Sequence, residues 1–202
     1  DVYAGYLAKK IGLPINKFIV ATNQNDILHR AITNGAYNVE NVLETISPSM
    51  DIQIASNFER LIFDLNNCND KKTIDVMRDI KEKGKYKIQK EYLDKINVDF
   101  LSSRMDENEV LNTIKSVYEK FDKVLDPHSA IGYGAFDKVN LKGNNIVLAT
   151  AHPCKFPGAI EKAINVKAEL PKELAFILDE KENYDIIENN LNKIKQHIKE
   201  KI

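Results

Sequence analysis

The chain has 202 residues, 43% of them apolar, and its acidic and basic residues nearly cancel to a net charge of −1. This composition is typical of a globular protein with a hydrophobic core. A nucleic-acid-binding protein would need a basic surplus or a basic stripe, so we expect no nucleic-acid partner. No apolar run approaches the ~20 residues of a membrane-spanning helix, so we expect no membrane partner either.

The two cysteines, Cys68 and Cys154, lie far apart in the sequence. No secretory signal opens the chain, and we therefore expect two reduced thiols in the cytoplasm. The chain starts at Asp1 and enters a helical pattern at once, without a lead-in. This start favours a fragment of a longer protein.

Helical and strand patterns alternate in the first part of the chain. In order, they predict a helix over 1–12 capped by Asp1, a buried strand over 17–21, a turn over 22–26 and a helix to about Asn34. The Asn34-Gly35 pair is expected to end that helix. Residues 42–54 look irregular, with a short strand possible near Ile52.

The middle of the chain is predicted to be helical. Ser56 and Glu59 form a capping-box pattern before one apolar helical face, and Asp106 and Glu109 repeat that pattern before another. Acidic residues interrupt the lysines of the charged region over 71–95, which favours a solvated helical surface. Asp126-Pro127 predicts a further helix start, because proline suits the first helical position.

Residues 145–149 (NIVLA) form the clearest strand pattern, since an unbroken apolar run is expected of a parallel strand covered on both faces. A helix is predicted from Pro157, and two more helical stretches near Lys172 and from about Tyr184. Strands separated by helices predict an α/β fold, with a parallel sheet flanked by helices. We expect residues 1–170 to form this α/β part and residues 171–202 a helical extension.

Ligands of open α/β sheets bind beyond the carboxyl ends of the strands, which points to residues 22–26 and 150–155. The free amides at the first helix start, at Asp1, could also bind phosphate. Local patterns alone favour ordinary structural roles for both candidates, with Thr150 satisfying a backbone amide and Asp1 acting as a bare helix cap. His152 and Cys154 are too few for a structural zinc site, so no metal is expected. Asp126 and His128 lack the nucleophile of a hydrolytic triad, and we expect no catalytic residue here.

Four segments, in this order and spacing, resemble threonine synthases. They are IVATNQNDILHR (19–30), SPSMDIQIASNFERL (47–61), VLDPHSAIGY (124–133) and ATAHPCKFPGAI (149–160). The opening residues DVYAGYLAKKIGLP resemble the stretch that follows the glycine-rich phosphate loop of this family, with Asp1 at the last position of the loop. The resemblance covers nearly the whole chain.

The resemblance implies the C-terminal portion of a fold-type-II enzyme that uses pyridoxal 5'-phosphate and is related to tryptophan synthase β. Threonine synthases are lyases of threonine biosynthesis that convert O-phospho-L-homoserine and water to L-threonine and phosphate. By this resemblance, Thr150 contacts the pyridine nitrogen of the cofactor and the Asp1 amide its phosphate. The Schiff-base lysine belongs to the N-terminal half of the enzyme, which is the expected partner. The chain alone should therefore be inactive.

Two alternatives stay open: a related phospholyase acting on another amino-acid phosphate, and a non-catalytic α/β binding module. Several polar residues of the matched segments could line a substrate pocket, although each also has an ordinary turn or capping explanation. They are Asn23, Asp26, Ser47, Asp51, Asn57, Arg60 and His152. Cys154 replaces the usual alanine of the family segment, so we expect its thiol to be dispensable.

Overall fold

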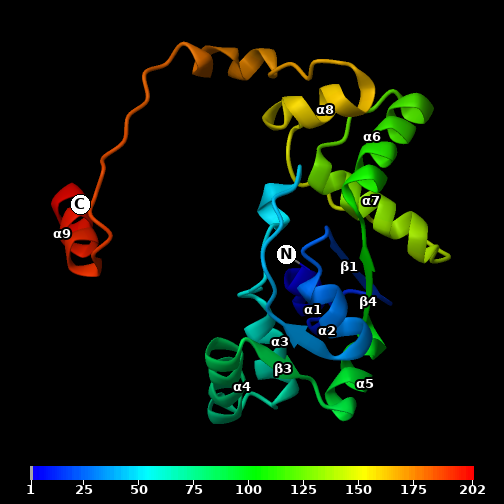
Figure 1. Ribbon diagram of the computed structural model, residues 1–202, viewed down its shortest axis with the longest axis vertical. Coiled ribbons are helices and arrows are strands. Elements are labelled where there is room, and N and C mark those ends of the chain that lie inside the picture. The colour runs from blue at the N-terminus through cyan, green and yellow to red at the C-terminus, as the bar shows by residue number, and fades with distance from the viewer. Residues whose placement is uncertain (1) are drawn as a thin grey trace. The chain divides into compact units, whose positions relative to one another are not determined.

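The computed structural model describes residues 2–202, which form two compact units divided after Ala168. The elements of the first unit (Figure 1) are α1 (Val2–Lys10), β1 (Phe18–Thr22), α2 (Ile27–Asn34), β2 (Ala36–Asn38), η1 (Pro48–Met50), α3 (Phe58–Leu65), α4 (Asp70–Lys83), β3 (Lys85–Lys87), α5 (Lys90–Asp99), β4 (Phe100–Arg104), α6 (Glu107–Phe121), α7 (Pro127–Val139), η2 (Pro153–Lys155) and α8 (Pro157–Ile164). The second unit contains η3 (Lys172–Leu178) and α9 (Leu191–Lys201). No helix within residues 2–202 is both long and apolar enough to span a membrane.

The first unit is built around the parallel strand pair β1–β4. Phe18 lies opposite Phe100 and Thr22 opposite Arg104, and alternate residues of β1 are buried. Helices α2 and α7 pack on this pair. The predictions of a strand near residues 17–21 and of an α/β fold with a flanked parallel sheet are therefore confirmed. The sequence pattern did not predict β4, because its apolar residues give way to two serines and an arginine.

Two hydrophobic clusters stabilise this unit, and Figure 1 shows α3, α4 and α5, which contribute to the first, at the other end of the unit from α6 and α8, which contribute to the second. The first cluster joins β1 and Phe100 to α2, α3, α4 and α5, and in it the Tyr37 ring stacks on Phe58 at 4.8 Å. The second cluster joins Met105 to α6, α7 and α8. A Cβ atom at Gly134 would collide with Met105 Cε, so a larger residue there would force the end of the Met105 side chain to shift.

Several predicted helix ends are confirmed, but the capping box predicted before α3 is wrong. The capping box of Asp106 and Glu109 is present at α6, and Gly35 ends α2 in the left-handed conformation at φ 73°. The box predicted from Ser56 and Glu59 does not form. The chain turns before α3, and the Phe58 amide donates to the Ala55 carbonyl at 3.0 Å, which leaves the Ser56 side chain exposed.

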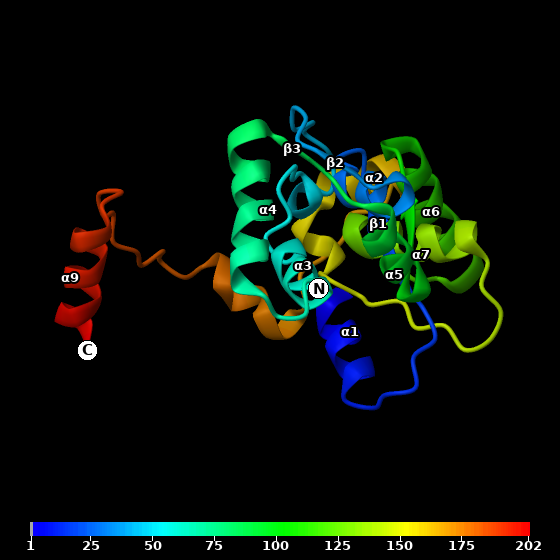
Figure 2. The same cartoon turned by 90° about the horizontal axis from the view of Figure 1, so that it is seen from below.

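Residues 145–149 are not a strand, which overturns the clearest strand prediction. They lie in the extended connection between α7 and α8 (Figure 2), and Ile146 and Leu148 are 89% and 65% exposed. A strand needs a hydrogen-bonded neighbour, and among the described residues β1 and β4 pair with each other and not with this segment.

Three further boundaries differ from the predictions. The chain near Ile52 is a bend in which the Ile52 amide donates to the Met50 carbonyl at 2.9 Å, so no strand forms there. The charged region over 71–95 contains two helices, because Gly84 ends α4 at φ 65° and β3 follows. The last helix begins at Leu191 and not near Tyr184, because the Asn190 side chain caps it.

Candidate functional site

The N-terminus of α7 collects hydrogen bonds on one buried carboxylate. Asp126 is 1% exposed and caps the helix. Its Oδ1 accepts from the His128 backbone amide and from His128 Nδ1, both at 3.0 Å. Its Oδ2 accepts from the Ser129 amide at 3.4 Å, from the Ser129 hydroxyl, and from the Ala151 amide at 3.3 Å. Asp126 therefore ties the start of α7 to the segment that follows residue 149.

Thr150 lies directly beside this carboxylate and is held by α7. Its backbone amide donates to Ser129 Oγ at 2.9 Å, and its hydroxyl lies 3.3 Å from the same oxygen. The Thr150 side chain is exposed. The structure thus fixes the backbone of Thr150 from one side and leaves its hydroxyl accessible.

His128 links the start of α7 to η1. Its Nε2 accepts from the Ser49 amide at 3.2 Å, so the ring proton sits on Nδ1, which donates to Asp126. The ring also packs against Phe156, with the ring centres 4.8 Å apart. Both ring nitrogens of His128 are therefore engaged within the protein.

A second polar cluster lies at the carboxyl end of β1. The Asp51 carboxylate accepts from Asn23 Nδ2 at 2.7 Å, Asn25 Nδ2 at 2.9 Å, and the amide and hydroxyl of Thr45 at 2.8 and 2.7 Å. Asn23 also donates to Ser47 Oγ at 3.0 Å. The structure thus brings together the candidates Asn23, Ser47 and Asp51, and it uses them to fasten the loop before η1 to the end of β1.

Two other candidates have partners of their own. The Asp26 carboxylate is paired with Arg30 Nε at 2.7 Å and with Arg104 Nε at 3.3 Å, and these guanidinium groups balance its charge. His152 caps η2, where its Nδ1 accepts from the Cys154 amide at 3.2 Å. No group of three or more His, Cys, Asp or Glu side chains in the described part of the chain is arranged to hold a metal.

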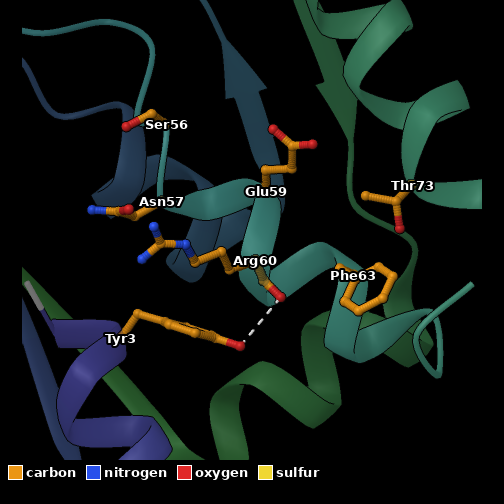
Figure 3. A pocket seen from close by; sticks show the side chains of 7 residues that line it. All are labelled: Tyr3, Ser56, Asn57, Glu59, Arg60, Phe63 and Thr73. Atoms are coloured by element: carbon orange, nitrogen blue, oxygen red, sulfur yellow. Dashed lines mark hydrogen bonds between the residues drawn. The ribbon is translucent and has the colours of Figure 1, made fainter. Parts of the chain in front are cut away.

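The remaining candidates, Asn57 and Arg60, line a cavity of about 470 Å³ with Tyr3 and four other residues. Figure 3 shows the guanidinium of Arg60 between Asn57 and the ring of Tyr3, whose hydroxyl donates to the Arg60 carbonyl at 3.5 Å. The predicted role of Asp1 lies outside the described residues. Among the described candidates, Asn57 and Arg60 are the two that line this cavity.

The sequence patterns did not single out Ser129, although its side chain contacts both the amide and the hydroxyl of Thr150. Ser129 follows Asp126 by three positions, a spacing at which a capping carboxylate reaches backbone amides of the first turn. No pattern in the sequence connects residue 129 with residue 150, because the two meet only when the extended connection folds back onto α7.

Comparison with known proteins places this chain among threonine synthases. A family model described as "Threonine synthase, C-terminal" matches residues 129–198. Threonine synthase of Pseudomonas aeruginosa is 38% identical over 201 residues, covering 98% of this chain and 43% of that protein. The Saccharomyces cerevisiae enzyme is 37% identical over 229 residues, covering all of this chain and 45% of its own length.

Solved structures agree with this placement. The pyridoxal-phosphate-bound threonine synthase from Brucella melitensis matches 99% of this chain, at 40% identity and a TM-score of 0.88. Yeast threonine synthase matches 99% of the chain, at 36% identity and a TM-score of 0.84. The chain covers 43% and 45% of these two structures, so it spans less than half the length of the relatives it matches. Sequence and fold together show that the chain belongs to the threonine synthase family and corresponds to the C-terminal portion of its members.

Proposed function

We propose that this chain is the C-terminal part of a threonine synthase that converts O-phospho-L-homoserine and water to L-threonine and phosphate. The similarity to threonine synthases over 98–100% of the chain supports this activity. The observation that carries the proposal is the Thr150 hydroxyl, which is accessible while its backbone is fixed by Ser129. It lies in the ATAHP segment that resembles the family.

The residues present fit pyridoxal 5'-phosphate as the cofactor. An unprotonated pyridine nitrogen accepts hydrogen bonds, and the accessible group of Thr150 is a hydroxyl, which can donate one. The neighbouring carboxylate of Asp126 is buried and occupied by donors within the protein, so it does not compete for the ring nitrogen. By the same resemblance, the amide of Asp1 would bind the phosphate.

When bound, the cofactor supplies the electron sink for proton removal from the substrate amino acid. Thr150 would hold the ring in place and leave its nitrogen unprotonated, since a hydroxyl stabilises a pyridinium far less than a carboxylate does. A weaker sink favours proton transfer without transamination. The role of this chain is therefore to orient the ring and to set the charge on its nitrogen.

We further propose that the N-terminal half of the same enzyme covers residues 145–149. Ile146, Val147 and Leu148 form an apolar run that is largely exposed to water in this chain, and exposed apolar runs of this kind mark contact surfaces. The relatives extend well beyond the matched length. The same half would supply the Schiff-base lysine, so the 202-residue chain alone should be inactive.

The test compares the full-length protein with the 202-residue chain, each supplied with pyridoxal 5'-phosphate and O-phospho-L-homoserine. The full-length protein should release phosphate and threonine in equal amounts, and the short chain should release neither. Phosphate release without threonine would favour a related phospholyase. Stoichiometric, borohydride-trappable labelling of one lysine in the short chain would contradict the assignment of the cofactor lysine to the N-terminal half.

A further inference from the structure

We infer that Ser129 and Asp126 are positioning residues that place the Thr150 hydroxyl against the cofactor ring. The inference rests on the proposed function, because it concerns how Thr150 reaches the ring nitrogen. It starts from the observation that residues 145–149 have no strand partner among the described residues, so within this part of the enzyme no sheet fixes the end of this segment. The contacts with the start of α7 fix it instead.

The first step is the acceptor role of Asp126. Four N–H groups point at its carboxyl: the amides of His128, Ser129 and Ala151, and His128 Nδ1. An N–H group can only donate, so both carboxyl oxygens act as acceptors. The Ser129 hydroxyl, which contacts Oδ2, must therefore donate its single proton to Asp126.

The second step concerns Ser129. Having donated its proton, Ser129 Oγ can only accept from its other neighbours, and it accepts from the Thr150 amide at 2.9 Å. It has no proton to give to the Thr150 hydroxyl, 3.3 Å away. That distance is long for a contact between two hydroxyls, whose usual separation is about 2.7–2.8 Å. The proton of Thr150 is therefore only weakly engaged and can turn to a better acceptor.

The third step is geometric. Two successive amides of one segment, those of Thr150 and Ala151, are both held by the first turn of α7. Two anchors one residue apart fix the orientation of the peptide between them and, with it, the direction of the Thr150 side chain. Asp126 is 1% exposed and Ser129 is 3% exposed, so neither contacts a ligand directly. Their influence on the cofactor must pass through Thr150.

The experiment uses the full-length protein loaded with cofactor that carries ¹⁵N in its ring, with variants Ser129→Ala, Thr150→Val and the double variant. Ser129→Ala should move the ring ¹⁵N resonance toward that of a pyridine without a hydrogen bond. It should also weaken cofactor binding by roughly 5- to 30-fold. Ser129→Thr, which keeps the hydroxyl, should restore both. Ser103→Ala, at a buried serine of β4, is the matched control and should change neither.

The double variant separates positioning from general support of the fold. If Ser129 acts through Thr150, Ser129→Ala should cause no further change in a Thr150→Val background. Additive effects, or a ring signal and affinity in Ser129→Ala equal to those of the wild type, would overturn the inference. A wild-type protein that binds no cofactor would overturn the proposed function and, with it, the inference. Thr150 is exposed, so Thr150→Val keeps the test available even if one Ser129 variant folds poorly.

Discussion

β1 and residues 145–149 are two apolar stretches of the first unit, and each is followed by polar residues. The two stretches are held in place by different contacts. β1 pairs with β4 along all five residues and buries Phe18, Val20 and Thr22. Residues 145–149 pair with no described strand and are mostly exposed, and the side chains of Ser129 and Asp126 hold the end of the segment.

The difference shows that the residues at the end of an apolar segment can be held in place even though the segment itself forms no strand. A ladder of backbone hydrogen bonds and a buried face stabilise β1 over its whole length. The other segment depends on a few contacts, and segments with few buried contacts open at low free-energy cost. We therefore expect changes in β1–β4 to alter stability, and changes at the end of the other segment to alter function.

The largest effect on stability is expected from Phe100→Ala in the strand pair β1–β4. Phe100 is 3% exposed and packs against the rings of Phe18 and Tyr6, with centres 5.4 and 5.2 Å apart. Its truncation leaves a cavity and should lower the free energy of unfolding of the 202-residue chain by about 3–5 kcal/mol. Urea denaturation measures this change. A loss below about 1 kcal/mol would show that the strand pair is not the centre of stability.

A smaller effect, on activity alone, is expected from Thr150→Ala. In the full-length enzyme the change should lower kcat/KM, because the ring nitrogen of the cofactor loses its hydrogen-bond donor. The activation free energy should rise by about 1–3 kcal/mol. The urea midpoint should stay the same, since the side chain is exposed. Thr150→Ser keeps the hydroxyl and serves as the control. Full activity in Thr150→Ala would contradict the claim that the end of the 145–149 segment serves function.

His29 lies on α2 beside β4, and its titration should change the free energy of unfolding by less than about 1 kcal/mol. Its Nδ1 lies 2.9 Å from Ser102 Oγ of β4, and burial, aided by Arg104 and Lys138, lowers its pKa despite the opposing charge of Asp26. The unfolded chain therefore binds this proton more readily. Stability should be full above the ordinary pKa of about 6.5 and should decline as pH falls through it.

His29→Gln removes the titrating group and should flatten this decline. Denaturation midpoints of both proteins between about pH 5 and pH 8 make the comparison. Curves of equal slope would mean that His29 does not contribute to the pH dependence.

The smallest effect is expected from Leu148→Ala in the 202-residue chain. Leu148 is 65% exposed, so its truncation should change the free energy of unfolding by no more than about 0.5 kcal/mol. In the full-length protein the same change should cost more, because the N-terminal half is proposed to cover this segment. An effect of about 2 kcal/mol in the short chain would mean that the segment is already buried there.

Local chemistry made much of this fold predictable. The strand near residues 17–21, the stop at Asn34-Gly35, the capping box of Asp106 and Glu109 and the start at Asp126-Pro127 each depend on neighbours in sequence. The pairing of β4 with β1 does not, because it joins residues about 80 positions apart. Residues 145–149 were wrongly predicted for the same reason: their composition favours a strand, but a strand also needs a neighbour.

The site was predictable only in part. Thr150 was chosen through its resemblance to a family segment, whereas local patterns alone favoured a structural threonine that satisfies a backbone amide. Asn23, Ser47 and Asp51 fall in matched segments, yet their side chains are occupied by one another and by Thr45 and Asn25. The contact between Ser129 and Thr150 could not be predicted from the sequence, because it depends on how the long connection after α7 folds back onto that helix.

The most direct test is a structure of the full-length protein with pyridoxal 5'-phosphate bound, in which the distance from Thr150 Oγ1 to the ring nitrogen is measured. We expect this distance to lie within hydrogen-bonding range, at about 2.7–3.2 Å, with Ser129 Oγ still accepting from the Thr150 amide. A separation above about 3.5 Å with no bridging water would contradict the assignment of Thr150 to the cofactor ring.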